Sequence, residues 1–404
     1  MFKFALLPAT LLATGLTVSS AHAAGSLTLL PYTPYSVNAT GTAAAGDDIN
    51  LNSVWMWTTT GGVQNIGGVS SINPGAGIAV ISADGSRIAG ATLDSATGTR
   101  SASVYNVATG QWTALAGLGG YSATPGTPAQ NATNFLSTGS VWAMSSDGTF
   151  VAGQSYQVGN GTTNSRATIW NTQTGTVTNL GNNPGITSGP NARTRVNGIS
   201  DNGRVAGGFG ANSTPLVWTD FDGDGSYATV SINAVSGAGS VNAVNAVSAN
   251  GQWAVGSGFI NSASGSAYRF NTSTNQLSFL GQLTAGVVGA ATAVNADGSV
   301  IVGYEGSGGA STRRGFIWTT AGGMQSFDDY LAGFGIDTAN SFNFATPIGI
   351  SADGRSIVGF GYANGSQVAQ GFLVNISAVP EPGTYAMFGL GLLLMAARRS
   401  RRAD

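Results

Sequence analysis

One ten-residue phrase recurs along the chain and constrains its fold more than any other feature. Each copy has two short apolar runs that flank Asp-Gly, Asn-Gly or a related pair. A seventh copy, Ile199–Gly207, reads one residue shorter than the other six. The six are Val37–Gly46, Ile81–Gly90, Met144–Gly153, Val247–Gly256, Val294–Gly303 and Ile350–Gly359. A repeat of this kind indicates that one structural unit is used many times.

Each phrase reads as a β-hairpin. Asp-Gly or Asn-Gly between apolar runs is the strongest local signal for a two-residue turn, in which both central residues take positive φ. Because asparagine substitutes freely for aspartate here, we assign these side chains to the turn and not to catalysis or calcium binding. The pairs are Asp84-Gly85, Asp147-Gly148, Asn202-Gly203, Asn250-Gly251, Asp297-Gly298 and Asp353-Gly354, after a degenerate Thr40-Gly41.

A second phrase follows each first one after a loop of variable length. It contains a strand that ends in an aromatic residue, a turn and another strand, as in Ala167–Leu180 (ATIWNTQTGTVTNL). Each unit therefore offers four short strands, and the hairpin glycines are 44 to 63 residues apart. Four strands in a unit of this length are typical of a propeller blade.

The two ends of this repetitive region decide the number of blades. The last unit has its first hairpin and a third strand, Gly371–Ile376, but no fourth. An unpaired edge strand invites aggregation, and Leu27–Leu30 can fill the vacant place. The sequence therefore predicts an all-β fold over residues 25–378: a β-propeller of seven blades closed by an N-terminal strand, with six blades as the alternative.

Two sets of residues recur at one position of the unit. Aromatic side chains at the end of the third strand could stack on sugar rings, but we expect them to pack blade against blade. They are Trp57, Tyr105, Trp170, Trp218, Phe270 and Trp318, with Val374 in the last unit. Repeated glycines are expected where backbones crowd or a strand bends, at Gly90, Gly153, Gly207, Gly256, Gly303 and Gly359.

The paired phrases resemble the HAF-type extracellular repeat, which occurs in secreted bacterial proteins. The resemblance spans nearly all of Val37–Ile376. It implies an extracellular repeat architecture and says almost nothing about activity.

The N-terminal segment has the features of a signal peptide. Lys3 precedes an apolar stretch from Phe4 to Val18, and Ala21-His22-Ala23 supplies small residues for cleavage. We therefore expect signal peptidase to remove residues 1–24, by cutting after Ala23 or Ala24.

The C-terminal segment, residues 379–404, has three parts in order. Val379, Pro380, Glu381 and Pro382 come first, an apolar run spans Tyr385–Ala397, and Arg398, Arg399, Arg401 and Arg402 end the chain. This tail resembles the PEP-CTERM sorting signal of Gram-negative exopolysaccharide producers. The resemblance implies removal by an exosortase after transient anchoring in the inner membrane through one transmembrane helix, with the arginines on the cytoplasmic side. It also implies a final location at the cell surface or in the extracellular matrix.

Composition argues against several classes of function. Between the two end segments the chain has ten arginines, no lysine and fifteen acidic residues, and a net charge near −5 disfavours nucleic acid. The chain has no cysteine, and its one histidine, His22, leaves with the signal peptide. Without imidazole or thiol, serine or cysteine triads and histidine-ligated zinc are excluded. We assign no catalytic residue and expect no organic cofactor.

The long loops suggest a ligand-binding face. If the phrases map onto blades as predicted, the loops after the second and fourth strands share the face opposite the Asp-Gly turns. Aromatic residues beside arginines there suit a polar, sometimes anionic glycan, although they could also anchor their own loops. The candidates are Tyr121, Arg193, Arg195, Tyr304, Arg313 and Arg314.

One acidic motif stands outside the repeat. Asp220, Asp222 and Asp224, followed by Gly225, resemble the opening of a calcium loop. Ser231 stands where the bidentate twelfth ligand should be, and the motif interrupts a predicted hairpin. A structural calcium ion that braces one blade and an acidic surface turn are both open.

These observations favour an exported, non-enzymatic surface or matrix protein with a structural or adhesive role beside exopolysaccharide. One alternative is a glycan-binding propeller. Another is an extracellular polysaccharide hydrolase or lyase, for which Glu305 is the sole glutamate between the end segments. No second acid is spaced to pair with it, which disfavours the enzyme.

Overall fold

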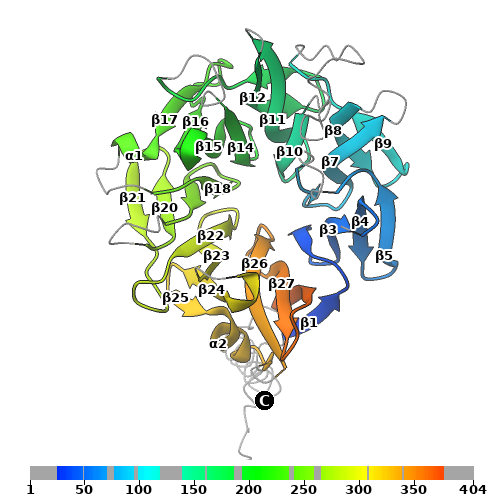
Figure 1. Ribbon diagram of the computed structural model, residues 1–404, viewed down its shortest axis with the longest axis vertical. Coiled ribbons are helices and arrows are strands. Elements are labelled where there is room, and N and C mark those ends of the chain that lie inside the picture. Colours follow the sequence, from blue (N-terminus) through cyan, green and yellow to red (C-terminus); the bar gives the residue numbers. More distant parts are fainter. Residues whose placement is uncertain are drawn as a thin grey trace, which may run out of the picture.

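The protein forms a closed ring of seven four-stranded antiparallel sheets (Figure 1). This computed structural model describes residues 25–48, 50–70, 77–94, 99–118, 139–159, 162–185, 193–235, 241–258, 265–306, 309–338 and 341–376. The prediction of an all-β propeller with seven blades is confirmed, and the alternative of six is wrong.

In the first six blades the four strands run outward in chain order. Blade 1 contains β2 (Pro34–Val37), β3 (Ala43–Asp48), β4 (Ser53–Thr58) and β5 (Gly62–Gly67). Blade 2 contains β6 (Val80–Ile81), β7 (Arg87–Asp94), β8 (Thr99–Asn106) and β9 (Gln111–Ala114). Blade 3 contains β10 (Gly139–Met144), β11 (Phe150–Gly159), β12 (Thr162–Asn171) and β13 (Val177–Asn179).

The later blades follow the same plan. Blade 4 contains β14 (Thr194–Ile199), β15 (Val205–Gly210), β16 (Pro215–Thr219) and β17 (Ala228–Ser231). Blade 5 contains β18 (Val244–Val247), β19 (Trp253–Gly256), β20 (Tyr268–Asn271) and β21 (Gln276–Phe279). Blade 6 contains β22 (Gly289–Val294), β23 (Val300–Glu305), β24 (Arg314–Thr319) and β25 (Gly323–Ser326). Short helices α1 (Ile232–Val235), α2 (Phe327–Ala332), η3 (Ala211–Ser213) and η4 (Ala310–Thr312) lie in the connections.

Blade 7 joins the two ends of the described chain. It contains β26 (Phe342–Ile350), β27 (Ser356–Ala363), β28 (Ala369–Ile376) and, outermost, β1 (Gly25–Leu30). β1 pairs antiparallel with β28 from Gly25 opposite Ile376 to Leu30 opposite Gly371. The predicted closure by Leu27–Leu30 is therefore confirmed, and Leu30 lies in a buried cluster with residues of blades 1 and 7.

The Asp-Gly turns are longer than the predicted two-residue turns. In blade 2, Gly85 has a φ of +75°, whereas the aspartate before it does not take a positive φ. The N–H of Gly85 donates to the Ser82 carbonyl (2.9 Å), and the N–H of Ser82 donates to the Arg87 carbonyl (2.9 Å). This is a β-turn followed by a left-handed glycine, so the expectation of two positive φ angles was wrong.

A buried serine explains the turn geometry. Ser82 Oγ donates to Asp84 Oδ1 (2.6 Å) and accepts from the N–H of Arg87 (3.0 Å). The same two bonds recur around Ser145, Ser200, Ser248 and Ser351. In blades 1 and 6 the equivalent residues are Asn38 and Asn295, whose side-chain oxygens accept the same backbone N–H. Each hydroxyl ties the acid or amide to the opposite strand, which holds the longer loop in place.

The repeated glycine sits beside a bulge of the innermost strand. In blade 3 the register of β10 shifts between Val141 and Ala143, and a Cβ on Gly153 would clash with the Ser140 carbonyl. In blade 4 the residue in this position is Gly208, whose Cβ would clash with the Arg195 carbonyl. The copy that begins at Ile199 therefore ends at Gly208 and is as long as the others, so the shorter reading was wrong. The prediction that Gly207 is the repeated glycine of this blade was wrong, because Gly208 directly follows it and occupies that position.

The repeated aromatic residues pack between blades, as predicted. Trp170 is 2% exposed, and Trp218, Phe270 and Val374 are fully buried. Trp57 and Tyr105 are half-buried. Hydrogen bonds between neighbouring inner turns add to this packing, for example Ala39 N to Ala83 O (2.8 Å) and Ala296 N to Ala352 O (3.0 Å). From blade 7 to blade 1, Asn375 Nδ2 on β28 donates to Gly41 O in an inner turn (3.2 Å).

The closing strand offers a matched pair of leucines. Leu30 is 1% exposed, whereas Leu29 is 45% exposed in the same strand. Leu30→Ala is expected to lower the free energy of unfolding by about 2–5 kcal/mol, because it leaves a cavity. Leu29→Ala is expected to change it by less than about 0.5 kcal/mol. Urea unfolding followed by tryptophan fluorescence measures both, and equal effects would show that β1 does not pack as the closing strand.

The aspartates of the turns predict how stability depends on pH. The Ser82 hydroxyl lowers the pKa of Asp84, and the Ser299 hydroxyl lowers the pKa of Asp297. The folded pKa thus lies below the unfolded value of about 3.9. These turns therefore contribute stability above that pH and lose it as the pH falls through the lowered folded pKa.

Asparagine at both positions tests this dependence. Asn202 and Asn250 occupy the same place in blades 4 and 5, so a variant carrying Asp84→Asn and Asp297→Asn is expected to keep its turns. Its urea midpoint is expected to stay close to that of the wild type at pH 7 and to fall less below about pH 4. Identical midpoints at every pH would contradict the assigned role of these carboxylates.

Candidate functional site

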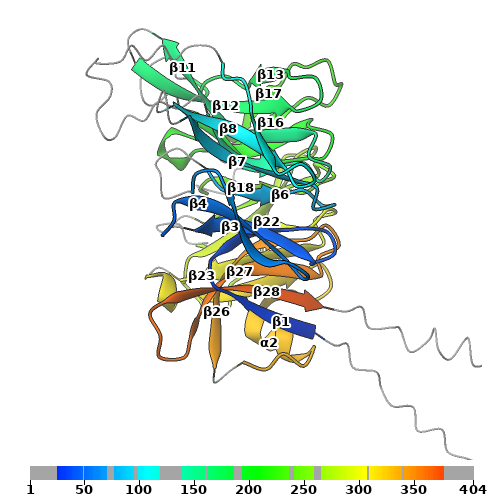
Figure 2. The ribbon, with the colours of Figure 1, turned by 90° about the vertical axis from the view of Figure 1, so that its right-hand side faces the viewer.

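The two ends of the ring carry different loops. The turns after the first and third strands of each blade lie on one side, here called the turn face, and the loops after the second and fourth strands lie on the other, the loop face. In Figure 2, which views the ring from its side, β11 extends toward the loop face on the left, and β1 and β28 have their terminal residues on the turn face at the right.

The chain enters and leaves the ring on the turn face. Gly25, the first described residue, lies opposite Ile376, the last. A shallow hollow beside them is lined by residues of blades 1 and 7, among them Thr40, Asp353 and Asn375. Any segment that continues from Ile376 therefore starts on the side of the Asp-Gly turns.

The predicted ligand residues lie on the loop face in two separate groups. Arg193 and Arg195 lie at the start of blade 4, whereas Tyr304, Arg313 and Arg314 lie where β23 leads to β24 in blade 6. Tyr121 lies outside the described residues. The structure thus does not bring the predicted set together at one site.

The guanidinium of Arg195 lies over two aromatic rings. Its Cζ atom lies 3.5 Å from the centroid of the Trp142 ring and 4.5 Å from that of Phe209. Its Nε donates to Asn197 Oδ1 (2.8 Å). Burial lowers the pKa of Arg195 to about 10, and nearby Tyr156 partly opposes the shift, so the guanidinium stays charged at neutral pH.

Further arginines surround Tyr156. Burial raises the pKa of this tyrosine, and the positive charges of Arg100, Arg193 and Arg195 oppose the rise. Arg100 is 2% exposed, whereas Arg193 is exposed. The charges of three arginines, from blades 2 and 4, therefore act on one phenol of blade 3.

The predicted residues in blade 6 contact mainly one another and the loop that follows blade 5. The Arg313 guanidinium lies over the Tyr304 ring, with Cζ 4.1 Å from the centroid. Glu305 is buried, and its two carboxylate oxygens accept the N–H groups of Leu283 (2.7 Å) and Thr284 (3.0 Å). Burial raises the pKa of Glu305, and these two bonds and Arg314 oppose the rise. The carboxylate thus anchors the loop that follows blade 5.

A tunnel of about 250 Å³ runs along the axis of the ring. Its walls come from the innermost strands and carry mostly aliphatic side chains, such as Val37, Ile81 and Ile350. Among the described residues that line it, Asp201 is the sole charged one, and its carboxylate accepts the N–H of Ser146 (2.8 Å). Trp142 and Asn197, which both contact Arg195, also line the tunnel. Asn197 is the first residue of β14 that lines it, and Arg195 precedes Asn197 on this strand, so Arg195 lies at the loop-face mouth of the tunnel.

Sequence reasoning missed Trp142, Phe209, Tyr156 and Arg100. These residues lie in three different blades, so their proximity depends on the order in which blades close into a ring. The available signal was local: at the position where neighbouring copies carry Asn197, Asn245 and Thr292, the third copy carries a tryptophan.

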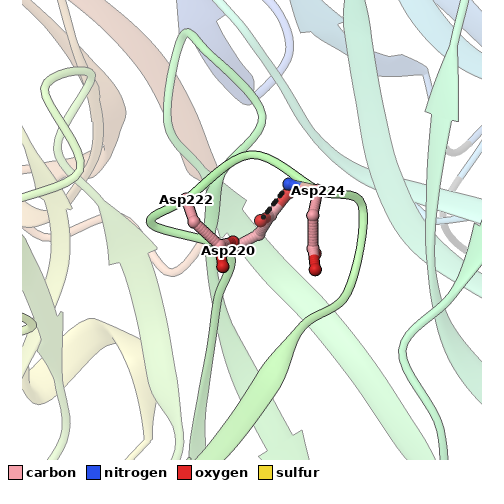
Figure 3. Close-up of side chains that lie close together, drawn as sticks. All are labelled: Asp220, Asp222 and Asp224. Atoms are coloured by element: carbon pink, nitrogen blue, oxygen red, sulfur yellow. Dashed lines mark hydrogen bonds between the residues drawn. The ribbon is translucent and has the colours of Figure 1, made fainter.

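The acidic motif of blade 4 does form a cluster (Figure 3). Carboxylate oxygens of Asp220, Asp222 and Asp224 lie within 4.8 Å of one another, in the loop between β16 and β17. Asp220 is buried and accepts the N–H groups of Gly223 (2.8 Å), Asp224 (3.1 Å) and Gly225 (3.1 Å). The hydrogen bonds make Asp220 the organiser of an acidic turn.

The loop meets the requirements of calcium only in part. Three carboxylates supply hard oxygen ligands, but the Arg204 guanidinium lies against Gly223 and donates to the Phe221 carbonyl (3.4 Å), which places a positive charge beside the acids. Calcium needs six to eight oxygen ligands. A structural calcium ion at this turn stays a prediction from the sequence.

The targeting segments lie outside the described residues. This applies to the signal peptide at 1–24, to Val379–Pro382 and to the four terminal arginines. Within the part of the chain that the structure describes, none of the helices is both long enough and apolar enough to span a bilayer. The predicted transmembrane helix at Tyr385–Ala397 therefore stays a prediction.

Comparison with solved structures shows the fold alone. The chain is similar to one from a structural study of two prolyl endopeptidases, with a TM-score of 0.51 and 11% identity over 86% of this chain and 50% of that one. It is also similar to TolB from Acinetobacter baumannii, with a TM-score of 0.41 and 16% identity over 73% of this chain and 61% of that one. It is similar as well to the β-propeller domain of the Trilobed protease from Pyrococcus furiosus, with a TM-score of 0.48 and 11% identity over 88% of this chain and 99% of that one. The chain thus spans half of the prolyl endopeptidase and 61% of TolB.

The tail, in contrast, matches a defined motif. A comparison with curated proteins gives no significant match to the sequence. Residues 378–402 match the PEP-CTERM protein-sorting motif. The chain therefore combines a seven-bladed propeller with an exosortase sorting motif, which implies an exported protein that is sorted at a membrane.

Proposed function

We propose that the protein is a non-enzymatic component of the cell surface or extracellular matrix of a Gram-negative bacterium, with a structural or adhesive role beside exopolysaccharide. The observation that carries the proposal is the sorting motif at residues 378–402, which begins two residues after the closed propeller ends at Ile376. A compact closed ring suits a protein that must persist outside the cell without disulfides.

The side chains support a role without catalysis. Glu305 is the one glutamate between the end segments, and the N–H groups of Leu283 and Thr284 occupy its two oxygens. The aspartates of the turns are likewise engaged, as Asp147 is with Ser145 and Thr149. Glycoside hydrolysis by the usual route needs a pair of carboxyl groups that flank the substrate bond, and these carboxylates are committed to loop structure.

The exit point of the chain gives the proposal an orientation. Ile376 lies on the turn face, and the apolar run that would enter the membrane starts at Tyr385. A fully extended linker of this length reaches about 30 Å. The turn face of the unprocessed protein is therefore held near the membrane, and the loop face, with its arginines and aromatic residues, points away from it.

Two threonines of blade 6 test this orientation. Thr312 lies on the loop face and Thr320 on the turn face, and both are exposed. Because the chain has no cysteine, Thr312→Cys and Thr320→Cys each create a single reactive site. In the membrane-anchored precursor a maleimide on a large polymer is expected to label Thr312→Cys at least about threefold faster, since the bilayer screens the other face. Detergent-solubilised protein is the control, and equal rates in the membrane would refute the orientation.

The proposed role is tested with the polysaccharide of the producing bacterium. The purified protein is expected to sediment with the polysaccharide, while the chain length of the polymer, followed by size-exclusion chromatography, stays constant over a day. Protein sedimented without polymer is the control. Shortening of the polymer would assign an enzyme instead, and failure to co-sediment would contradict an adhesive role.

A further inference from the structure

The seam between blades 3 and 4 departs from the pattern of its neighbours. At the bulge of the innermost strand, Asn197, Asn245 and Thr292 each donate to a carbonyl of the next blade, namely Val244 O (2.6 Å), Ala291 O (2.8 Å) and Pro347 O (2.6 Å). In blade 3 the bulge residue is Trp142, which lies against Arg195 of blade 4. A stacked cation thus stands where the next three seams around the ring have a neutral hydrogen bond, and bulges often re-aim a side chain at a site.

Arg195 is held in place with the two terminal nitrogens of its guanidinium, here called its fork, available. The guanidinium carbon lies over the rings of Trp142 and Phe209, and Asn197 accepts from Nε. Among the described residues, no group accepts from its two terminal nitrogens, and neither nitrogen is sealed from solvent. A planar fork held in this way matches two oxygens of one carboxylate, and little side-chain entropy is left to lose on binding.

The charge around the fork favours an anion. Arg100 and Arg193 act on the same tyrosine as Arg195, although the chain between the end segments is acidic overall. A positive charge held in a partly buried place attracts an anion more strongly than one in open solvent. Among the described residues no carboxylate lies within ion-pair distance of Arg195.

The surrounding groups suit a sugar acid better than a bare anion. The Tyr156 hydroxyl, near which Gln154 Nε2 lies (3.4 Å), and the exposed Arg193 offer donors for sugar hydroxyls beside the carboxylate fork. Aromatic faces beside polar groups are typical of carbohydrate sites. Two other arginines lie over aromatic rings, namely Arg269 over Trp253 and Trp318, and Arg313 over Tyr304. The site at Arg195 differs because the charges of two further arginines act on its tyrosine, Tyr156.

We propose that Arg195, with Arg193 and Tyr156, binds the carboxylate of a hexuronate residue in an acidic polysaccharide, at the loop-face mouth of the tunnel. The inference rests on the proposed function in that it takes a matrix glycan as the partner, and it names the chemical class of that glycan. The site faces away from the chain ends, so a polymer can reach it before and after tail processing.

The experiment measures binding to the full chain in detergent by isothermal titration calorimetry. The probe is β-1,4-trimannuronate, and the comparator is β-1,4-mannotriose, which lacks the carboxylates. Arg195→Gln is expected to weaken trimannuronate binding at least about tenfold, and Arg193→Gln up to about fivefold because that arginine is exposed. Arg355→Gln makes the same charge change on the turn face and is expected to leave binding within twofold of wild type.

Folding is controlled by the urea midpoint of each variant. If Arg195→Gln fails to fold, Arg193→Gln and a loss of wild-type affinity with rising NaCl carry the test. Four results would each overturn the site. The wild type does not bind trimannuronate, or it binds mannotriose equally well. Inorganic phosphate competes at the same concentration as trimannuronate, or Arg195→Gln binds trimannuronate as tightly as the wild type. Each of these results leaves co-sedimentation with the native polysaccharide to decide the proposed function separately.

Discussion

The pairing of β1 with β28 is the contact on which the rest of this molecule depends, because it turns a row of sheets into a ring. Six residues of the first described strand form the outer edge of the last blade, across nearly the whole length of the chain. The entropic cost of closing so long a loop grows only with the logarithm of its length. Burial of Leu30 and continuous backbone pairing oppose that cost, and closure gives every blade two neighbours.

Within the ring, each blade has one buried polar side chain that holds its inner turn. A buried serine or asparagine bonds to the turn on one side and to the second strand on the other, so the chain reverses at the same depth in every blade. The inner turns can then bond to one another around the axis, as Ala39 does with Ala83. Departures between copies are informative, since Trp142 stacks on Arg195 at the position where the next three blades carry an amide or a hydroxyl.

Closure also decides what each face can do. The chain ends lie together on the turn face, and the sorting motif follows at once, so the face of the long loops is the one presented away from the membrane in the proposed orientation. The arginine cluster on that face has an open fork and a positive surround. The acidic loop of blade 4 is organised by Asp220, and the carboxylate of Glu305 is taken up by a loop. The proposed binding role therefore relies on the arginines of the loop face.

Local patterns were enough to predict the strands, the turns, the number of blades and the closing strand. Each follows from short-range chemistry: alternating apolar runs, glycine at a left-handed position and an edge that must be covered. The same patterns misplaced Gly207 and the turn type, because the hydrogen bonds of Ser200 and the bulge beside Gly208 appear only once strands are paired.

The sequence predicted less of the candidate site than of the fold. Arg193 and Arg195 were recognised by type and loop position, but Trp142, Phe209, Tyr156 and Arg100 come from three blades. Composition and motif determined where the chain is sent and what it is built from. Which side chains meet, and which face the sorting tail leaves, were decided by ring closure, because proximity between blades is a property of the assembled circle and not of any single repeat.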